Sequence, residues 1–388
     1  MNLRPWTMSI TAMSIIAGLI MAGCSSDAEP EASATPTPTT GTGDAPSPTR
    51  SRAPSPTPQP TTAAPAGPVA PTGNADVVAT DLDVPWDLEF LDDGTALVTE
   101  RNTARVRRVE PNGELTDIGE VPGVSASGEG GLLGIAHHQN WLYVMFTAGD
   151  DNRVVRMAFD GESLGEPEVI VDGLPKAGIH NGGRIVFGPD GMLYIGAGDA
   201  NNGENAQDVD SPAGKILRVT PEGDVPDDNP FDGSPVWSYG HRNVQGLAFD
   251  DEGRLWASEF GQRTWDELNL IEAGENYGWP IVEGIADDDE FTDPVLQWST
   301  ADASPSGIAY VRDTIFMAGL RGQRLWQIPV PDGSAGEPQE FFTGEYGRLR
   351  HAELAPDGTL WLLTNNTDGR NPDGPGPDDD QIVRVSLE

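Results

Sequence analysis

One of the five histidines in this chain has a setting suited to proton transfer. His180 lies in HNGGR (180–184), where the following glycines leave room around the imidazole. A neutral imidazole titrates near pH ~6.5, which suits a general base. The alternative is a loop histidine that only caps a structural element. No histidine pair has the HExxH spacing of zinc proteases, and neither a GxSxG elbow nor a phosphate-binding loop is present.

A second polar cluster occupies the segment GHRNVQG (240–246). It brings Arg242, Asn243 and Gln245 together in one turn that is bounded by glycines. A planar guanidinium can hold a carboxylate through two parallel hydrogen bonds. The segment therefore predicts a binding site for an anion, with a plain surface turn as the alternative.

Two more arginines follow in RLRH (348–351). In a strand, residues two apart face the same way, so Arg348 and Arg350 should point together. Arg321, in the Leu-Arg-Gly at 320–322, can join them from the preceding repeat. Paired cations in such an acidic chain predict an anion clamp.

Oxygen ligands gather in a fourth region, made of SEFGQ (258–262), WDE (265–267) and NYGWP (276–280). Carboxylates beside Gly and Pro turns suit Ca²⁺, which takes six to eight oxygen ligands. The alternative is an acidic solvated loop, because 62 Asp and Glu outnumber 23 Lys and Arg and the net charge is −39. The same charge excludes nucleic acid as a partner, since phosphate binding needs a basic surface.

These clusters flank a repeated pattern of short strands. From residue 90 on, a turn of the Asp-Gly type and an apolar run recur, as in PDGMLYIGAGD (189–199), and a second strand follows each copy. There are six second strands, and each carries an apolar anchor residue. Consecutive anchors are 48 to 62 residues apart: Val106, Val154, Ile216, Leu268, Leu325 and Ile382. A period near 50 is typical of a β-propeller with one four-stranded blade per repeat. The sequence predicts an all-β, six-bladed β-propeller, closed by pairing of a strand near 77–81 with the C-terminal strand.

The N-terminal part predicts export and a lipid anchor. A short apolar run over residues 8–21 ends in Met-Ala-Gly before Cys24, the chain's one cysteine. This pattern resembles a bacterial lipoprotein signal peptide over residues 1–24, with an ordinary secretory signal as the alternative. Residues 25–75 hold 12 of the 34 prolines and no aromatic residue, which predicts an extended tether. The folded domain is expected over residues 76–388, outside the cytoplasm and anchored to the cell membrane by lipid alone.

Taken together, the motifs resemble a known enzyme family from about residue 75 to the C-terminus. GEGGLLGIA (128–136), HNGGR, GHRNVQGLAF (240–249), DELNLIEAGENYGWP (266–280) and RLRH are similar to the soluble glucose/aldose sugar dehydrogenases that use pyrroloquinoline quinone (PQQ), a glucose/sorbosone dehydrogenase-like family. Members are six-bladed propellers, in agreement with the repeat count. The resemblance implies an enzyme that oxidises an aldose at C1 to the lactone by hydride transfer to PQQ, with Ca²⁺ as second cofactor.

The resemblance also implies a role for each candidate residue. His180 would be the base that takes the proton of the C1 hydroxyl, and Arg242 would help to stabilise the developing oxyanion. The cofactor would be held by Arg242, Asn243, Gln245, Arg321, Arg348 and Arg350. Gly261 and Gln262 would offer carbonyl oxygens to the Ca²⁺ that polarises the quinone. A second, structural Ca²⁺ would be bound by Glu267, Tyr277 and Asp287, and Glu129 would approach the substrate.

Several positions depart from the family pattern. Glu129 stands where the family usually has Gln, Arg321 replaces a Lys and Gln262 a Pro. Ile179 replaces an Asp of the glucose-oxidising members, which argues against glucose-specific recognition. Two alternatives come from other classes. One is a non-catalytic propeller lipoprotein that binds a cell-envelope ligand, and the other is a lactone hydrolase, whose metal site needs carboxylates rather than arginines in the channel. The partners implied are a small aldose and an electron acceptor that the sequence does not name.

The lipid anchor gives a first prediction. Cys24→Ser removes the acylated atom, so we expect the protein to leave the membrane fraction while its export continues. Cell fractionation and immunoblotting measure this. Retention of the variant in the membrane, with the signal peptide cleaved, would contradict a lipoprotein.

Overall fold

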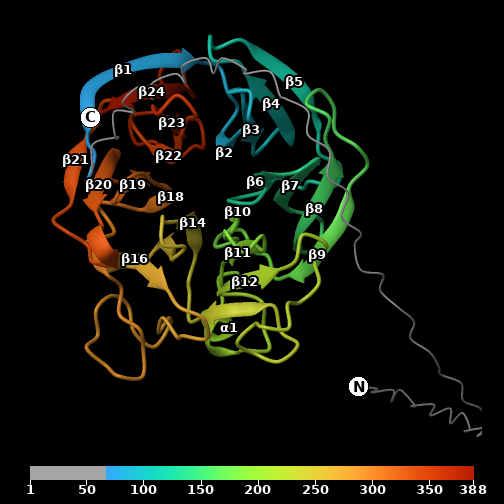
Figure 1. The fold of residues 1–388 in the computed structure, drawn as a ribbon, viewed down its shortest axis with the longest axis vertical. Coiled ribbons are helices and arrows are strands. Elements are labelled where there is room, and N and C mark those ends of the chain that lie inside the picture. The colour runs from blue at the N-terminus through green and yellow to red at the C-terminus, as the bar shows by residue number, and fades with distance from the viewer. Residues whose placement is uncertain (1–66) are drawn as a thin grey trace, which may run out of the picture. The chain divides into compact units, whose positions relative to one another are not determined.

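The computed structural model describes residues 67–388, which form six four-stranded antiparallel sheets. The sheets surround a common axis as the blades of a six-bladed β-propeller (Figure 1). The predicted fold class and blade number are confirmed. The only helices in the described residues are α1 (Glu204–Gln207) and the 3-10 turn η1 (Pro331–Gly333). No helix in this part of the chain is long and apolar enough to cross a membrane. The predicted signal peptide and most of the predicted tether lie outside the described residues.

The first three blades follow the chain in order. Blade one contains β2 (Pro85–Phe90), β3 (Ala96–Glu100), β4 (Arg105–Val109) and β5 (Leu115–Glu120). Blade two contains β6 (Leu132–His138), β7 (Trp141–Thr147), β8 (Asn152–Ala158) and β9 (Glu168–Leu174). Blade three contains β10 (Ile185–Phe187), β11 (Leu193–Ala197), β12 (Lys215–Val219) and β13 (Val236–Tyr239).

The last three blades complete the ring. Blade four contains β14 (Val244–Phe249), β15 (Leu255–Glu259), β16 (Trp265–Ile271) and β17 (Leu296–Ser299). Blade five contains β18 (Pro305–Tyr310), β19 (Thr314–Gly319), β20 (Arg324–Pro329) and β21 (Gln339–Phe341). Blade six contains β22 (Leu349–Leu354), β23 (Leu360–Thr364), β24 (Ile382–Leu387) and β1 (Pro71–Ala79).

The two repeated sequence elements are the two middle strands of each blade. The apolar anchors identified above lie on β4, β8, β12, β16, β20 and β24, and all six are fully buried. The Asp-Gly turns join the first strand to the second, and Gly191 before β11 shows why glycine is needed there, with a φ of 76°. Apolar side chains of neighbouring blades pack into six buried clusters, one between each pair of blades.

The ring is closed by β1, which pairs antiparallel with β24 as predicted. β1 begins at Pro71, however, and the preceding Val69 is already buried and donates its N–H to Thr314 Oγ1 at 2.9 Å. The folded domain therefore starts before the boundary expected at residue 76. Within β1, Pro71 and Ala79 are buried while the other described side chains are exposed or half-buried, so its sequence resembles that of a tether.

The first strands of neighbouring blades contact one another around the axis (Figure 1). These six strands are β2, β6, β10, β14, β18 and β22. Strand direction alternates within a blade, so the entry to each first strand and the loop between the second and third strands lie at the same end of the ring. All the candidate quinone, base and substrate residues belong to these two kinds of segment.

Candidate active site

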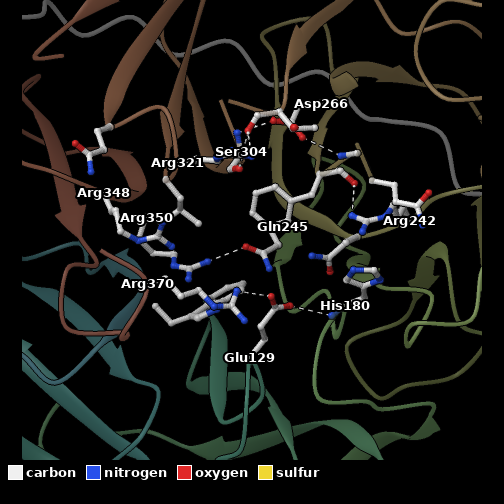
Figure 2. Close-up of a pocket in the computed structure, with 18 of the residues that line it drawn as sticks. Glu129, His180, Arg242, Gln245, Asp266, Ser304, Arg321, Arg348, Arg350 and Arg370 are labelled. Carbon is white, nitrogen blue, oxygen red and sulfur yellow. Dashed lines mark hydrogen bonds and ion pairs between the residues drawn. The ribbon is translucent and has the colours of Figure 1, made fainter. Parts of the chain in front are cut away.

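A cavity of about 490 Å³ lies at this end of the axis (Figure 2). Its volume is in the range of pockets that take a small organic ligand. Ten residues that the sequence assigned to the base, the quinone, the substrate and the quinone-bound Ca²⁺ all line it: Glu129, His180, Arg242, Asn243, Gln245, Gly261, Gln262, Arg321, Arg348 and Arg350. Sequence segments up to 221 residues apart are thus brought to one site.

His180 is held in a strained loop by contacts on both sides. Its φ is 61°, its N–H donates to Glu129 Oε2 at 2.9 Å, and its ring Nδ1 lies 2.7 Å from Asp199 Oδ1. An ionised carboxylate can only accept a hydrogen bond, so Nδ1 carries the proton in the neutral ring. Nε2 is then the ring's acceptor, and no residue from 67 to 388 hydrogen-bonds to it. The arrangement presents a free proton acceptor to the cavity.

Asp199 is itself fixed. It is almost fully buried and accepts hydrogen bonds from the Asn201 N–H at 2.7 Å and from Trp279 Nε1 at 2.8 Å. Oδ1 thus accepts from the Asn201 N–H as well as from the imidazole, and Oδ2 accepts from Trp279. This carboxylate orients the His180 ring and can stabilise an imidazolium.

Positive charge dominates the cavity wall. Five arginines line it, with Arg370 joining the four expected ones, against two carboxylates, Glu129 and Asp266. Arg350 is buried, and within the described residues its guanidinium donates only to neutral oxygens, those of Gln245, Ser306 and Asn365, at 2.7 to 3.2 Å. Burial, together with the nearby Arg101 and Arg348, lowers the pKa of Arg350 to about 9. An anion that binds beside such a buried, unpaired guanidinium stabilises its charged form.

The other cofactor candidates are also only partly satisfied. Arg242 donates to the Phe260 carbonyl at 3.0 Å, lies 5.4 Å from the Trp279 ring, and has no carboxylate within ion-pair distance in the described part of the chain. Arg242 Nε, Arg350 Nε and Asn243 Nδ2 are buried without a hydrogen-bond partner among residues 67–388. Unpartnered buried donors are costly, and a ligand with acceptor oxygens would satisfy them.

Known proteins with a similar sequence or fold now identify the family. The sequence profile of the glucose/sorbosone dehydrogenases matches residues 82–372. The chain belongs to the glucose/sorbosone dehydrogenase family. It is 31% identical over 353 residues to the aldose sugar dehydrogenase YliI of Escherichia coli, covering 79% of this chain and 92% of that protein.

The names of two further relatives mention a quinone cofactor. Quinoprotein glucose dehydrogenase B of Acinetobacter calcoaceticus is 34% identical over 254 residues, which is 55% of this chain and 53% of that protein. The PQQ-bound structure of an aldose sugar dehydrogenase from Streptomyces coelicolor has 52% sequence identity and a TM-score of 0.78, and the match covers 82% of this chain and all of that one.

Four cavity or near-cavity residues of this family member were not predicted as site residues. Asp199 closes the repeat segment LYIGAGD, where an acid directly after a buried strand was an available signal. Asp266 lines the cavity and accepts from the Gly261 and Ser304 N–H groups at 2.9 and 2.6 Å, and burial raises its pKa to about 7. Trp86 and Arg370 also line it. Neither has a sequence signal, because each reaches the cavity only through the closure of the ring.

The residues expected at a second, structural Ca²⁺ have different surroundings. Glu267 is buried and accepts from the Gly284 N–H at 2.7 Å, while burial and Glu259 raise its pKa to about 8. The buried Tyr277 donates its hydroxyl to the Leu270 carbonyl at 2.7 Å, and Asp287 is exposed. No group of three or more His, Cys, Asp or Glu side chains within residues 67–388 is arranged to hold a metal. This Ca²⁺ site stays a prediction that would need backbone oxygens as well.

Calcium binding should be visible as a change in thermal stability. A ligand that binds only the native state stabilises it by about 2.7 kcal/mol at 100 times its Kd, which raises Tm by several degrees. We expect added Ca²⁺ to raise Tm and a chelator to lower it in differential scanning calorimetry. Glu267→Gln should reduce the shift, while Asp172→Asn, an exposed acid on β9, should not. A Tm that is insensitive to both Ca²⁺ and chelator would contradict the predicted Ca²⁺ sites.

Proposed function

We propose that this protein is a quinoprotein sugar dehydrogenase that oxidises an aldose at C1 to the lactone, with PQQ as hydride acceptor, His180 as general base and Ca²⁺ as second cofactor. The observation that carries the proposal is the juxtaposition of a fixed His180–Asp199 pair with buried arginines that lack acid partners. The cofactor and sugar named for the Acinetobacter, Escherichia and Streptomyces relatives support the same reaction class.

The donor set of the cavity fits PQQ. The cofactor carries three carboxylates, and the wall offers Arg350 and Arg242 without acid partners in the described residues, with Arg348 and the exposed Arg321 beside them. The buried Arg242 Nε, Asn243 Nδ2 and Arg350 Nε lack acceptors among the described residues, and carboxylate or quinone oxygens would supply them. Gln245 keeps Arg350 in place through its 2.7 Å contact. These residues would hold the quinone.

Proton removal falls to His180. When bound, PQQ supplies the two-electron acceptor that takes the hydride from C1 of the sugar. His180 Nε2 accepts the proton of the C1 hydroxyl, and the resulting imidazolium is stabilised by the Asp199 carboxylate 2.7 Å from Nδ1. The hydrogen bonds from Trp279 and Asn201 hold Asp199 in place during this step.

Arg242 is positioned for electrostatic stabilisation. The Phe260 carbonyl orients one end of its guanidinium, its Nε has no partner among the described residues, and the residue lines the cavity. A fixed cation in a partly buried site stabilises developing negative charge at little reorganisation cost. Gly261 and Gln262 follow Phe260 directly, and no described residue donates a hydrogen bond to either carbonyl oxygen. These two oxygens are therefore free to serve Ca²⁺ at this edge of the cavity.

The cellular setting is part of the same proposal. An acyl group on Cys24 and the tether that follows would leave the propeller outside the cytoplasm with its cavity free to meet small sugars. The electron acceptor would meet the protein there too.

Substitution of the base and substitution of an arginine should affect different quantities, turnover in the first case and PQQ binding in the second. His180→Gln should leave PQQ binding nearly intact and reduce turnover by ~10²-fold or more, the usual contribution of a positioned base. Arg350→Ala should instead weaken PQQ binding, because a charge-assisted contact is lost, and excess PQQ should restore much of the rate. Dye reduction at saturating aldose, with PQQ titrated for each variant, measures both effects.

His138→Gln is the matched control, since this histidine lies at the end of β6 outside the cavity. Circular dichroism verifies that each variant folds. Full activity in His180→Gln, or no PQQ binding by the unaltered protein, would reject the dehydrogenase and favour a propeller that binds a cell-envelope ligand.

A further inference from the structure

An ion pair lies along the cavity beside the candidate base. Arg370 Nη1 contacts Glu129 Oε1 at 2.5 Å, and both residues line the cavity (Figure 2). They are 241 positions apart in the sequence, in the segment before β6 and in the loop between β23 and β24. The pair therefore joins blades two and six across the cavity wall. The reaction described above gives it no role.

Glu129 is fixed in position and in charge. Its other oxygen accepts the His180 N–H at 2.9 Å, and its own N–H donates to the Gly178 carbonyl at 2.9 Å. Burial alone would raise the pKa of Glu129, but the hydrogen bonds from Arg370 and the His180 N–H hold it below its ordinary value. The carboxylate thus stays ionised, in direct contact with the backbone of the candidate base.

Arg370 is fixed by a second carboxylate. Asp368 Oδ1 accepts the Arg370 N–H at 2.8 Å, and Asp368 Oδ2 accepts from Arg348 Nη2 at 3.0 Å. The loop that carries Arg370 is therefore tied to one of the proposed quinone arginines. The Arg370 side chain is 50% exposed, and Glu129 is the one acceptor that its guanidinium meets among the described residues. Most of its five N–H donors remain available.

The pair combines free donors on Arg370 with acceptor lone pairs on Glu129, and its net charge is zero. A sugar hydroxyl both donates and accepts, so a hydroxyl between the two groups satisfies both of them. Glu129 accepts the backbone N–H of His180, so the pair lies beside the candidate base and would be near the substituents next to the reacting carbon. We infer that Glu129 and Arg370 jointly bind the 2-hydroxyl of the sugar and select neutral aldoses that carry one. This inference rests on the proposed function and assigns Arg370 as a specificity-determining residue.

Charge balance makes the inference testable in two directions. Arg370→Gln leaves Glu129 as an unpaired anion, which should favour a cationic substituent at C2. Glu129→Gln keeps an oxygen for the His180 N–H but leaves Arg370 as an unpaired cation, which should repel that substituent. A residue with a purely structural role cannot produce opposite effects from these two substitutions.

The experiment compares glucose, 2-deoxyglucose and glucosamine as substrates of the full chain loaded with PQQ and Ca²⁺, at a pH where the amine of glucosamine is protonated. For the unaltered protein we expect kcat/KM to be ~10-fold or more higher for glucose than for 2-deoxyglucose, because a hydroxyl bound to charged groups is lost. Each single variant should bring this ratio towards one, mainly through KM. The glucosamine-to-glucose ratio should rise ~10-fold in Arg370→Gln and fall in Glu129→Gln.

Two controls complete the design. Arg324→Gln removes a similar ion pair, to Glu340 at 2.8 Å, on the outer part of blade five, and should change no ratio. Inhibition by 1,5-anhydroglucitol, which keeps the 2-hydroxyl but has no hydroxyl on C1, reports binding without turnover and should weaken ~10-fold in both single variants.

The outcomes separate the two hypotheses. Oxidation of all sugars with ratios and inhibition unchanged in both variants would overturn the role of Arg370 and Glu129 and leave the dehydrogenase intact. Parallel rather than opposite changes towards glucosamine would also overturn it, because the pair would then only brace the cavity. Failure of the unaltered protein to oxidise any sugar with PQQ would reject the proposed function and this inference with it.

Discussion

Buried positive charge without a negative partner is the constraint on which the site depends. Arg350 is 4% exposed, and its guanidinium donates to neutral oxygens of the described residues. Burial, Arg101 and Arg348 lower its pKa, and the opposing effect of Asp368 and Glu129 does not restore it. A chain with 62 acidic residues has many ways to neutralise such a group, yet none of the described carboxylates forms an ion pair with Arg350. The folded protein therefore keeps a site that a multivalent anion completes.

The propeller supplies this constraint by geometry. Six inter-blade cores hold the blades in a ring, and each blade directs the entry of its first strand to the same end of the axis. Residues such as His180 and Arg350 thus meet although no local segment could bring them together. Arg350 lies on β22, whereas His180, Arg242, Arg321, Arg348 and Arg370 lie in segments next to or between the strands. The positions of His180 and Arg370 depend on Asp199 and Asp368. Acidic side chains in this site serve mainly to orient basic ones.

The sequence predicted the parts of the structure that repeat. Most of the second and third strands are rich in buried apolar residues, and their recurrence predicted the fold and the blade count. The outermost strands are exposed and carry no such pattern, which is why β1 was placed too late in the chain. Ten site residues could be identified through motifs and family resemblance. Arg370 could not, because its role follows from a contact between blades two and six. Asp199 was missed although an acid closes its repeat segment, because its contact with His180 forms only when the two ends of the β10–β11 hairpin meet.

The most direct test of the central claim is the affinity of the metal-loaded protein for PQQ compared with its trimethyl ester, measured by isothermal titration calorimetry. The ester keeps the ring system and quinone but removes the three negative charges. If the unpaired arginines are the binding determinant, PQQ should bind at one site per chain and at least ~10²-fold more tightly than the ester, since each lost charge-assisted contact costs about 1.5–3 kcal/mol. Equal affinity of the acid and the ester would contradict the account.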